Sequence, residues 1–264
     1  MKKRFSIIIT AYNIEEYIQR SIKSVKEQTF QDYEIVVVND CSKDETKKKV
    51  EEIGGVKLIN HEENKGAGGA RNSALDVAEG EYIIFLDGDD YLHDSNVLEK
   101  LDKVIGNQNP DVVYMGFQFG GDRDELIIPT PENCTKSIKA AKDPYPNVWS
   151  KCWNRVFIEK NHFRFCEKRY YEDVLFLYRG VMRSESFLIA PFPVHTYISG
   201  RTNSITTTLN FKNIYDTIAN LEEMTEMKKT EPTEELDYIM KREINMCKKR
   251  LEKIIKWNKK YIWK

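Results

Sequence analysis

The chain has 264 residues, 41% hydrophobic and 31% charged, which suits a globular protein of one large domain or one domain with a small appendage. No apolar run approaches the roughly 20 residues that a membrane-spanning helix needs, and the run after MKKR is also too short for a signal peptide. The net charge of −1 hides an asymmetry, because residues 241–264 carry +8 and the remainder −9, which predicts a surface partner for this basic tail.

Strand and helix patterns alternate through the first 120 residues. Strands are predicted at RFSIIITAYN, DYEIVVVND, VKLINH, EYIIFLD and DVVYMGFQF, with helices at IEEYIQRSIKSVKEQ, SKDETKKKVEEI, GARNSALDVAEG and Val97–Ile105. This alternation predicts βαβ units and a mostly parallel, Rossmann-like α/β sheet covered by helices on both faces. Ligands bind such sheets at the carboxyl ends of the strands, where Thr10–Asn13, Asn39–Ser42 and Asp87–Asp90 are expected to meet.

The pattern is looser beyond Gly120. A loop or hairpin is predicted at GGDRDELIIPTPENC, a helix at Tyr171–Met182, strands around Phe187–Ile198 and two helices from about Asn213, separated near Thr230–Pro232. Pro144–Phe165, which contains Trp149, Trp153 and Phe157, is expected to pack beneath the site. The five cysteines are scattered without a C-x-x-C pair, so we expect no disulfide or zinc framework and a cytoplasmic location.

The stretch DGDD places Asp87, Asp89 and Asp90 directly after a predicted buried strand. Three carboxylates so close together repel one another unless they are solvated, capped or neutralised by a cation. One interpretation is a polar turn that caps the next helix. The other is a metal site, because Mg²⁺ and Mn²⁺ prefer oxygen ligands and leave positions for phosphate oxygens.

The succession SIIITAYN, QTFQDYEIVVVNDCSKDET, NKGAGGARNSALDVAEGEYIIFLDGDD and YEDVLF resembles the family 2 glycosyltransferases of the GT-A fold over roughly the first 200 residues. The resemblance implies a GT-A domain at 1–210, with a nucleotide-binding half at about 1–120 and an acceptor half at about 121–210, followed by a basic helical extension at 211–264. It also implies inverting transfer of a sugar from a UDP-sugar, with Mn²⁺ or Mg²⁺, to a glycan or lipid-linked acceptor in bacterial surface polysaccharide synthesis.

The resemblance also implies a set of donor-binding residues. Asp87-Gly88-Asp89 is similar to the family's DxD motif, with Asp89 as a direct metal ligand and Asp87 on the ribose or near the metal. Asp90 either caps the next helix or contacts the donor sugar. The uridine site is expected at Thr10, Tyr12, Asn13 and Asp40, with Tyr12 stacking on the base and Asp40 accepting from the uracil imide. Asn39 stands where a second Asp is frequent, and Cys41 where Gly is usual.

Two arginines are candidates for the donor phosphates. Arg71, at the start of a predicted helix, either faces the phosphates or pairs with Asp76 or Glu79 on the surface. Arg201, close to Ser204 in SGRTNSIT, is either a pyrophosphate ligand or a surface arginine.

Glu172-Asp173 is similar to the family's catalytic ED pair. The resemblance implies that Asp173 takes the proton from the acceptor hydroxyl and that Glu172 orients the acceptor or the base; a simple helix cap is the alternative. The segment that contains Trp149 and Lys151 resembles a family segment beside the acceptor site. The alternative is that Trp149 packs in the core and Lys151 is solvated. His195 is interpreted as a structural histidine and not as a metal ligand.

The basic tail offers two alternatives. Apolar residues at roughly helical spacing among lysines suit a helix on the inner face of an anionic membrane, or a solvated helix packed on the acidic body. No nucleic-acid partner is expected. The alternatives to a glycosyltransferase are a sugar-phosphate nucleotidylyltransferase, a non-catalytic sugar-nucleotide-binding protein and a membrane scaffold.

Overall fold

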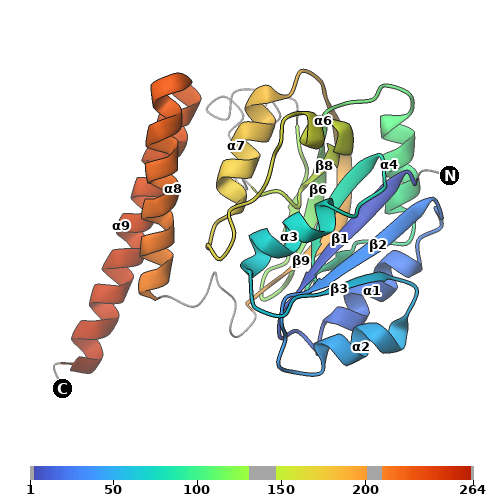
Figure 1. Ribbon diagram of the computed structural model, residues 1–264, viewed down its shortest axis with the longest axis horizontal. Helices are drawn as coiled ribbons and strands as arrows, with labels where there is room; N and C mark the ends of the chain where they lie inside the picture. The colour runs from blue at the N-terminus through green and yellow to red at the C-terminus, as the bar shows by residue number, and fades with distance from the viewer. Residues whose placement is uncertain (1–2, 131–146, 201–209, 263–264) are drawn as a thin grey trace.

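The structure is a computed structural model that describes residues 3–130, 147–200 and 210–262, without the side chains of 257–262. Figure 1 shows a sheet with helices on both sides and a long helical hairpin beside it. The first half contains β1 (Phe5–Ala11), α1 (Ile18–Lys26), β2 (Tyr33–Asn39), α2 (Thr46–Ile53), β3 (Lys57–Asn60), α3 (Gly66–Leu75), β4 (Tyr82–Asp87), β5 (Tyr91–Leu92), α4 (Val97–Ile105), β6 (Val112–Gly121) and β7 (Leu126–Ile127). The second half contains β8 (Lys151–Asn154), α6 (Arg155–Lys160), α7 (Asp173–Arg183), β9 (Phe187–Ser199), α8 (Phe211–Thr230) and α9 (Glu234–Ile262).

The described strands form one sheet in the order β3-β2-β1-β4-β8-β6-β9-β5, with β7 paired to β6. The pairs β3–β2, β2–β1 and β1–β4 are all parallel, as the strand–helix alternation predicts. β8 lies antiparallel between β4 and β6, and the β6–β9 pair is again parallel. The predicted α/β class is therefore confirmed, while the antiparallel centre was not predicted, because the four residues of β8 are too few to show a period.

Apolar side chains fill both faces of the sheet. Along β1, Ile8 joins one core cluster and Ile7 and Ile9 join the other, which explains why the strand is apolar without alternation. Residues of α1, α2 and α4 cover one face, and residues of α3, α6 and α7 cover the other. Both faces are thus buried, and the parallel pairing of β3, β2, β1 and β4 brings their carboxyl ends to one edge.

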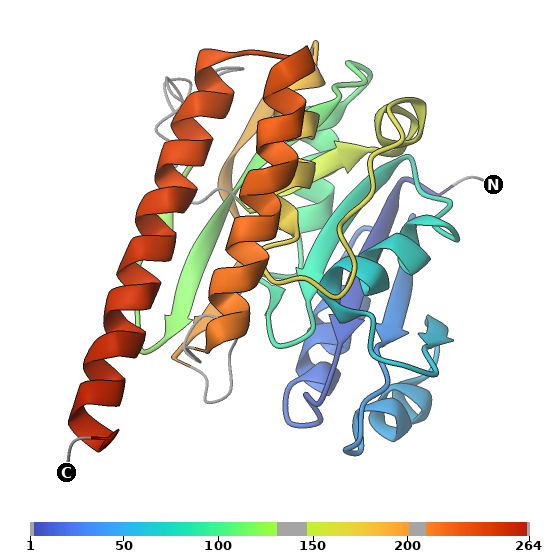
Figure 2. The ribbon, with the colours of Figure 1, turned by 60° about the vertical axis from the view of Figure 1, so that its left-hand side comes forward.

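The C-terminal hairpin packs on the α3 and α7 side of the sheet. Figure 2 shows α8 and α9 side by side in front of the sheet. Asn210 begins α8 as a reciprocal cap with Asn213, and Met224, Leu236 and Ile239 share a core cluster with Trp153 of β8. Within the described ranges, no helix is long and apolar enough to cross a membrane.

Candidate functional site

Three polar strand ends meet at one edge of the sheet. In the parallel register Thr10 lies beside Asp87, and Ala11 lies beside Asn39. The Thr10 hydroxyl lies 3.5 Å from Asp87 Oδ1. The predicted convergence of the segments after β1, β2 and β4 is therefore confirmed, although the roles assigned to their residues stay predictions.

The carboxylates of the DGDD turn differ in burial. Asp87 is 29% exposed at its side chain, whereas Asp90 is buried and accepts a hydrogen bond from the Ile198 amide at 2.8 Å. Burial, together with the nearby Asp89 and Asp87, raises the pKa of Asp90 well above its ordinary value. A Cβ at Gly88 would lie 2.7 Å from the Thr10 carbonyl oxygen, so this position requires glycine. Asp90 is thus oriented into the fold, and Asp87 and Asp89 are left at the edge.

Asp87 and Asp89 suit a divalent cation by their chemistry. They offer hard carboxylate oxygens, and a diphosphate and water would complete the coordination. The Asp89 backbone is fixed, because its carbonyl accepts from Arg20 Nη2 at 2.7 Å and the Arg20 guanidinium lies over the Tyr91 ring. Among the described residues, no three His, Cys, Asp or Glu side chains converge as ligands.

The predicted uridine site has an exposed and a buried part. Tyr12 is 48% exposed, and Asn13 joins the β1 and β2 ends by accepting from the Lys43 amide at 2.8 Å. Asp40 is buried, and its Oδ1 lies 2.7 Å from His61 Nδ1 and accepts from the Lys65 amide at 2.8 Å. Tyr12 is therefore open to a base, whereas one Asp40 oxygen is already engaged within the protein.

Cys41 has a φ of +63°, in the left-handed region that favours glycine. This conformation explains why glycine is usual at that position in the family that the sequence resembles. Cys41 adopts this conformation, and its Sγ lies 3.3 Å from the Glu62 carbonyl oxygen. The departure in sequence therefore leaves the turn after β2 in place.

Arg71 joins the DGDD turn to the Glu172-Asp173 pair. Its guanidinium pairs with Asp87 Oδ1 at 2.8 Å and with Glu172, which lies 101 residues away in the chain. The group is 4% exposed and lies over the Phe165 ring at 5.4 Å. Burial opposes its charge, but the carboxylates of Asp87, Glu172 and Asp173 outweigh burial and raise the pKa of Arg71 above its ordinary value. Arg71 therefore stays charged and holds two of the predicted motifs together.

The surface alternative for Arg71 is wrong. Asp76 pairs instead with Arg164 at 3.2 Å, and Glu79 with Lys57 at 3.3 Å. Within the described residues, Arg71 Nε is buried without a hydrogen-bond partner, so the guanidinium has an unused donor. The role of Arg71 at the donor phosphates stays a prediction. Its contacts with Asp87 and Glu172 were not predicted from the sequence.

Glu172 is the N-cap residue of α7 and Asp173 is its first residue, so the pair lies at a helix start as predicted. Glu172 does not cap the helix with its side chain, because its carboxylate pairs with Arg71. Burial and the neighbouring Glu172 raise the pKa of Asp173 to about 7, against the lowering effect of Arg71. A carboxylate with that pKa can accept a proton near neutral pH.

Trp149, one of the two residues expected near the acceptor, belongs to an aromatic cluster. Trp149 stacks on Tyr197 with ring centroids 5.3 Å apart and meets His195 edge-on at 4.7 Å. His195 is buried, and burial lowers its pKa to about 3, consistent with a neutral structural histidine. The solvated alternative for Lys151 is wrong, because this lysine is 1% exposed and donates to the Asn147 carbonyl at 3.0 Å.

Arg201 and Ser204 lie outside the described residues. Two further residues were not singled out from the sequence, His61 beside Asp40 and Arg20 beside Asp89. His61 directly follows β3, so the strand-end rule that selected the other positions would have found it. Arg20 lies in the first turn of α1, and no local pattern marks it.

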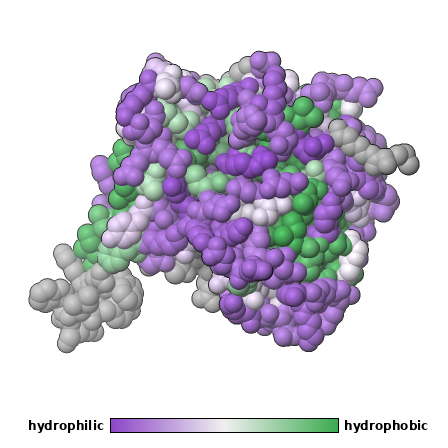
Figure 3. All heavy atoms as spheres, viewed as in Figure 1, coloured by the Kyte–Doolittle hydropathy of each residue, from purple (hydrophilic) through white to green (hydrophobic). Residues whose placement is uncertain are grey.

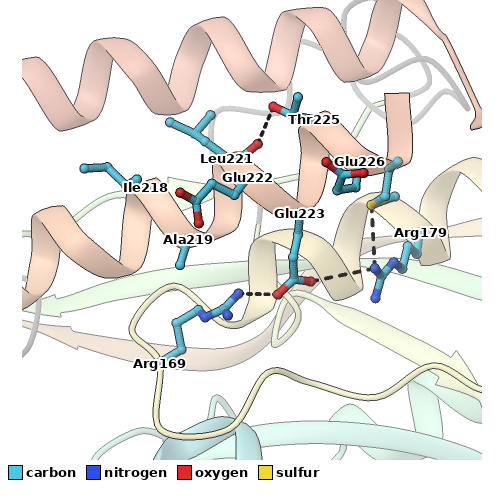
Figure 4. Close-up of a pocket in the computed structure, with 10 residues that line it drawn as sticks. Arg169, Arg179, Ile218, Ala219, Leu221, Glu222, Glu223, Thr225 and Glu226 are labelled. Atoms are coloured by element: carbon cyan, nitrogen blue, oxygen red, sulfur yellow. Dashed lines mark hydrogen bonds and ion pairs between the residues drawn. The ribbon is translucent and has the colours of Figure 1, made fainter. Parts of the chain in front are cut away.

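A surface pocket of about 670 Å³ lies away from the strand ends, between α7, α8 and the segment that precedes Glu172. Figure 4 shows Glu223 of α8 reaching between Arg169 and Arg179. The Glu223–Arg169 pair measures 2.5 Å and the Glu223–Arg179 pair 3.9 Å. These contacts connect α8 of the hairpin to the segment before Glu172 and to α7.

Comparison with known proteins matches residues 6–175 to the model of the family "Glycosyl transferase family 2". Putative glycosyltransferase EpsH of Bacillus subtilis is 29% identical over 208 residues, which cover 73% of this chain and 60% of that protein. The Escherichia coli UDP-Glc:alpha-D-GlcNAc-diphosphoundecaprenol beta-1,3-glucosyltransferase WfgD is 41% identical over 116 residues, 43% of this chain and 46% of that protein. The chain thus spans about half to three fifths of these relatives.

Two solved structures share the fold. TarS 1–349 of S. aureus, in complex with UDP-GlcNAc, has a TM-score of 0.78 and 24% identity, covering 92% of this chain and 72% of that one. The mannosyltransferase PcManGT from Pyrobaculum calidifontis, in complex with GDP-Man and Mn²⁺, has a TM-score of 0.63 and 17% identity, covering 87% of this chain and 65% of that one. These likenesses confirm the predicted GT-A fold.

Proposed function

The chain belongs to glycosyl transferase family 2, and from this premise we propose that it transfers a sugar from a UDP-sugar to a glycan or lipid-linked acceptor. The observation that carries the proposal is the Arg71 bridge, which brings Asp87 at the end of β4 next to Glu172 and Asp173 at the start of α7. Transfer requires a donor site and a base on opposite sides of one reacting carbon, and this edge of the sheet supplies residues for both.

On the donor side, Asp89 and Asp87 would hold Mn²⁺ or Mg²⁺ together with the diphosphate. A bound cation would stabilise the negative charge of the leaving UDP. Tyr12 would stack on the uracil because its ring is exposed at the end of β1, and Thr10, Asn13 and Asp40 would surround the nucleoside. Arg71 would add its unused Nε–H to the positive field at this edge. Arg201 stays a candidate phosphate ligand.

On the acceptor side, Asp173 would act as the general base. The acceptor oxygen attacks the anomeric carbon as the bond from that carbon to the β-phosphate oxygen breaks, and the acceptor proton moves to Asp173. A single displacement of this kind inverts the anomeric configuration. The raised pKa of Asp173, about 7, suits the task because the group is a stronger base than an ordinary carboxylate. Glu172, held by Arg71, would orient the base or the acceptor.

Surface polysaccharide assembly is the proposed setting. It is supported by the relative whose name pairs UDP-Glc with a diphosphoundecaprenol acceptor, and by the exposed apolar side chains of α9. Ile244, Leu251 and Ile255 recur on one face of that helix, beside the exposed Lys241 and Lys248. Figure 3 shows apolar surface on the hairpin near its free end. We propose that this face contacts the inner side of an anionic membrane.

The transfer proposal is tested by incubating the enzyme with a panel of UDP-sugars and glycan or polyprenyl-diphosphate acceptors, with and without Mn²⁺, and measuring UDP release and product. Asp173→Asn should lower turnover by at least about 100-fold. Asp76→Asn, which changes a carboxylate that is 63% exposed, serves as the matched control. An Asp173→Asn enzyme as fast as the control would refute the assignment of the base.

The membrane proposal is tested by co-sedimentation with anionic phosphatidylglycerol vesicles and neutral phosphatidylcholine vesicles. Lys248→Glu with Lys249→Glu on α9 should weaken binding to anionic vesicles. Lys47→Glu with Lys48→Glu on α2 is the matched control, because it changes two other exposed lysines by the same charge, and it should leave binding unchanged. Equal binding by both double variants would contradict a role for α9.

A further inference from the structure

The backbone just before Glu172-Asp173 is strained. Lys168 has a φ of +55° and Tyr171 a φ of +59°, both in the left-handed region that non-glycine residues rarely adopt. Such a conformation costs about 1–2 kcal/mol per residue and persists only where the surroundings hold it. Since Tyr171 is the residue before Glu172, its backbone angles set the direction in which α7 and the pair begin.

One face of α8 holds this segment. Asp216 Oδ2 accepts from the Tyr170 amide at 2.8 Å, Asn220 Nδ2 donates to the Tyr171 carbonyl at 3.0 Å, and Asn213 Nδ2 donates to the Tyr171 hydroxyl at 2.9 Å. These three residues are spaced by three and four positions, so they lie on one side of the helix. α8 therefore bonds the amide of the residue before the strained Tyr171 and the carbonyl of Tyr171 itself.

The two asparagines on this face are buried. Asn213 is 0% exposed and Asn220 is 1% exposed, although the neighbouring Ile214 and Met224 are apolar. Burying an amide is unfavourable unless it is hydrogen-bonded, and an apolar residue would pack the helix at lower cost. The two asparagines thus make bonds that packing alone does not require.

Contacts from α9 and α3 complete the hold. The Arg250 guanidinium lies 3.8 Å from the centroid of the Tyr171 ring and donates to Thr217 Oγ1 at 2.8 Å. On the opposite side, the Lys168 amide donates to the Lys65 carbonyl at 2.7 Å. The segment therefore lies between α3, which also carries Arg71, and the C-terminal hairpin.

We propose that the α8–α9 hairpin is a positioning element for the Glu172-Asp173 pair, with Asn213, Asp216 and Asn220 as its positioning residues. The proposal rests on the proposed function, in which Asp173 is the base. The hairpin lies beyond the residues 6–175 that match the family, so this part of the chain sets the geometry of a site that the family region carries. Displacing a reacting group by about 1 Å lowers turnover on the order of 100-fold.

The kinetic test uses Asn220→Leu and Asp216→Asn. Asn220→Leu keeps the number and branching of the side-chain heavy atoms and removes the bonds to the Tyr171 carbonyl and to Arg169. Asp216→Asn keeps an acceptor oxygen for Tyr170. Glu222→Ala on the exposed face of α8 is the matched control. We expect Asn220→Leu to lower kcat by at least about tenfold with the donor KM within about twofold, and Asp216→Asn to stay close to wild type. A kcat of Asn220→Leu equal to that of Glu222→Ala would overturn the proposal.

A second test does not depend on transfer. Hydrogen exchange is followed by mass spectrometry in peptides that cover 166–175, in wild type, in Asp216→Ala combined with Asn220→Leu, and in Glu222→Ala. We expect faster exchange at 170–172 in the double variant alone, because the Tyr170 amide loses its acceptor. Unchanged exchange would overturn the positioning role. Faster exchange in an enzyme whose wild type transfers no sugar would refute the proposed reaction and still support the hold on this segment.

Discussion

Replacing Arg71 by methionine should destabilise the fold by about 3 kcal/mol. Methionine matches much of the arginine stem and suits the Phe165 and Phe85 rings, so the main loss is the charge. Breaking a buried ion pair from one side costs about 3–5 kcal/mol, because a charge is left without compensation. We take the lower end because Glu172 is 11% exposed whereas Asp87 is 29% exposed, so water compensates Asp87 in part.

The assay is urea unfolding followed by tryptophan fluorescence and circular dichroism. Arg164→Met is the matched control, because Arg164 also contacts two carboxylates but its side chain is 36% exposed. We expect the control to lose less than about 1 kcal/mol. An equal, small loss in both variants would refute the interpretation of Arg71 as a buried ionic bridge.

The sign of a second substitution sharpens this test. Glu172→Gln alone should destabilise the wild type, because it removes a partner of Arg71. In the Arg71→Met background it should instead restore about 1–2 kcal/mol, because it removes the carboxylate that was left unpaired. Additive losses in the double variant would contradict direct coupling between the two residues.

Three further predictions concern pH and packing. Because Asp173 must be deprotonated to act as the base and its pKa is raised to about 7, transfer should rise with pH up to about 7 and then level off, which a pH profile of kcat/KM would measure; a flat profile from pH 5 to 8 would count against the assignment. Gly68→Ala should cost about 1–3 kcal/mol in urea unfolding, because its Cβ would lie 2.1 Å from the Cys166 carbonyl oxygen. The pKa of His195 is lowered to about 3 by burial, so the unfolded chain binds a proton below about 6.5 that the folded chain does not; His195→Phe should reduce the loss of stability by up to about 1.4 kcal/mol per pH unit between 6.5 and 3, and an identical acid profile would contradict this.

The positions at the ends of β1, β2 and β4 could be predicted from the sequence, because each apolar run ends in polar residues and parallel strands bring these ends together. The same rule would have selected His61 after β3. Which of the DGDD carboxylates is buried could not be predicted, because the Ile198 amide that bonds Asp90 belongs to β9, far along the chain.

The partners of Arg71 could not be predicted from the local sequence pattern either. Asp76 and Glu79 are near in sequence, yet the fold supplies Asp87 and Glu172, because α3 packs against β1 and the segment before α7. Likewise the left-handed Tyr171 and the asparagines that hold it become visible only when α8 is placed against that segment. Long-range contacts of this kind depend on tertiary structure and carry no sequence period.

The most direct test of the central claim, that the DGDD turn holds a cation and a nucleoside diphosphate, is calorimetric titration of UDP with and without Mn²⁺. Wild type and Asp94→Ala, which changes a nearby exposed carboxylate, should bind UDP in a Mn²⁺-dependent manner, and Asp89→Ala should lose this binding. Binding of UDP by Asp89→Ala with the affinity and metal dependence of wild type would contradict the claim.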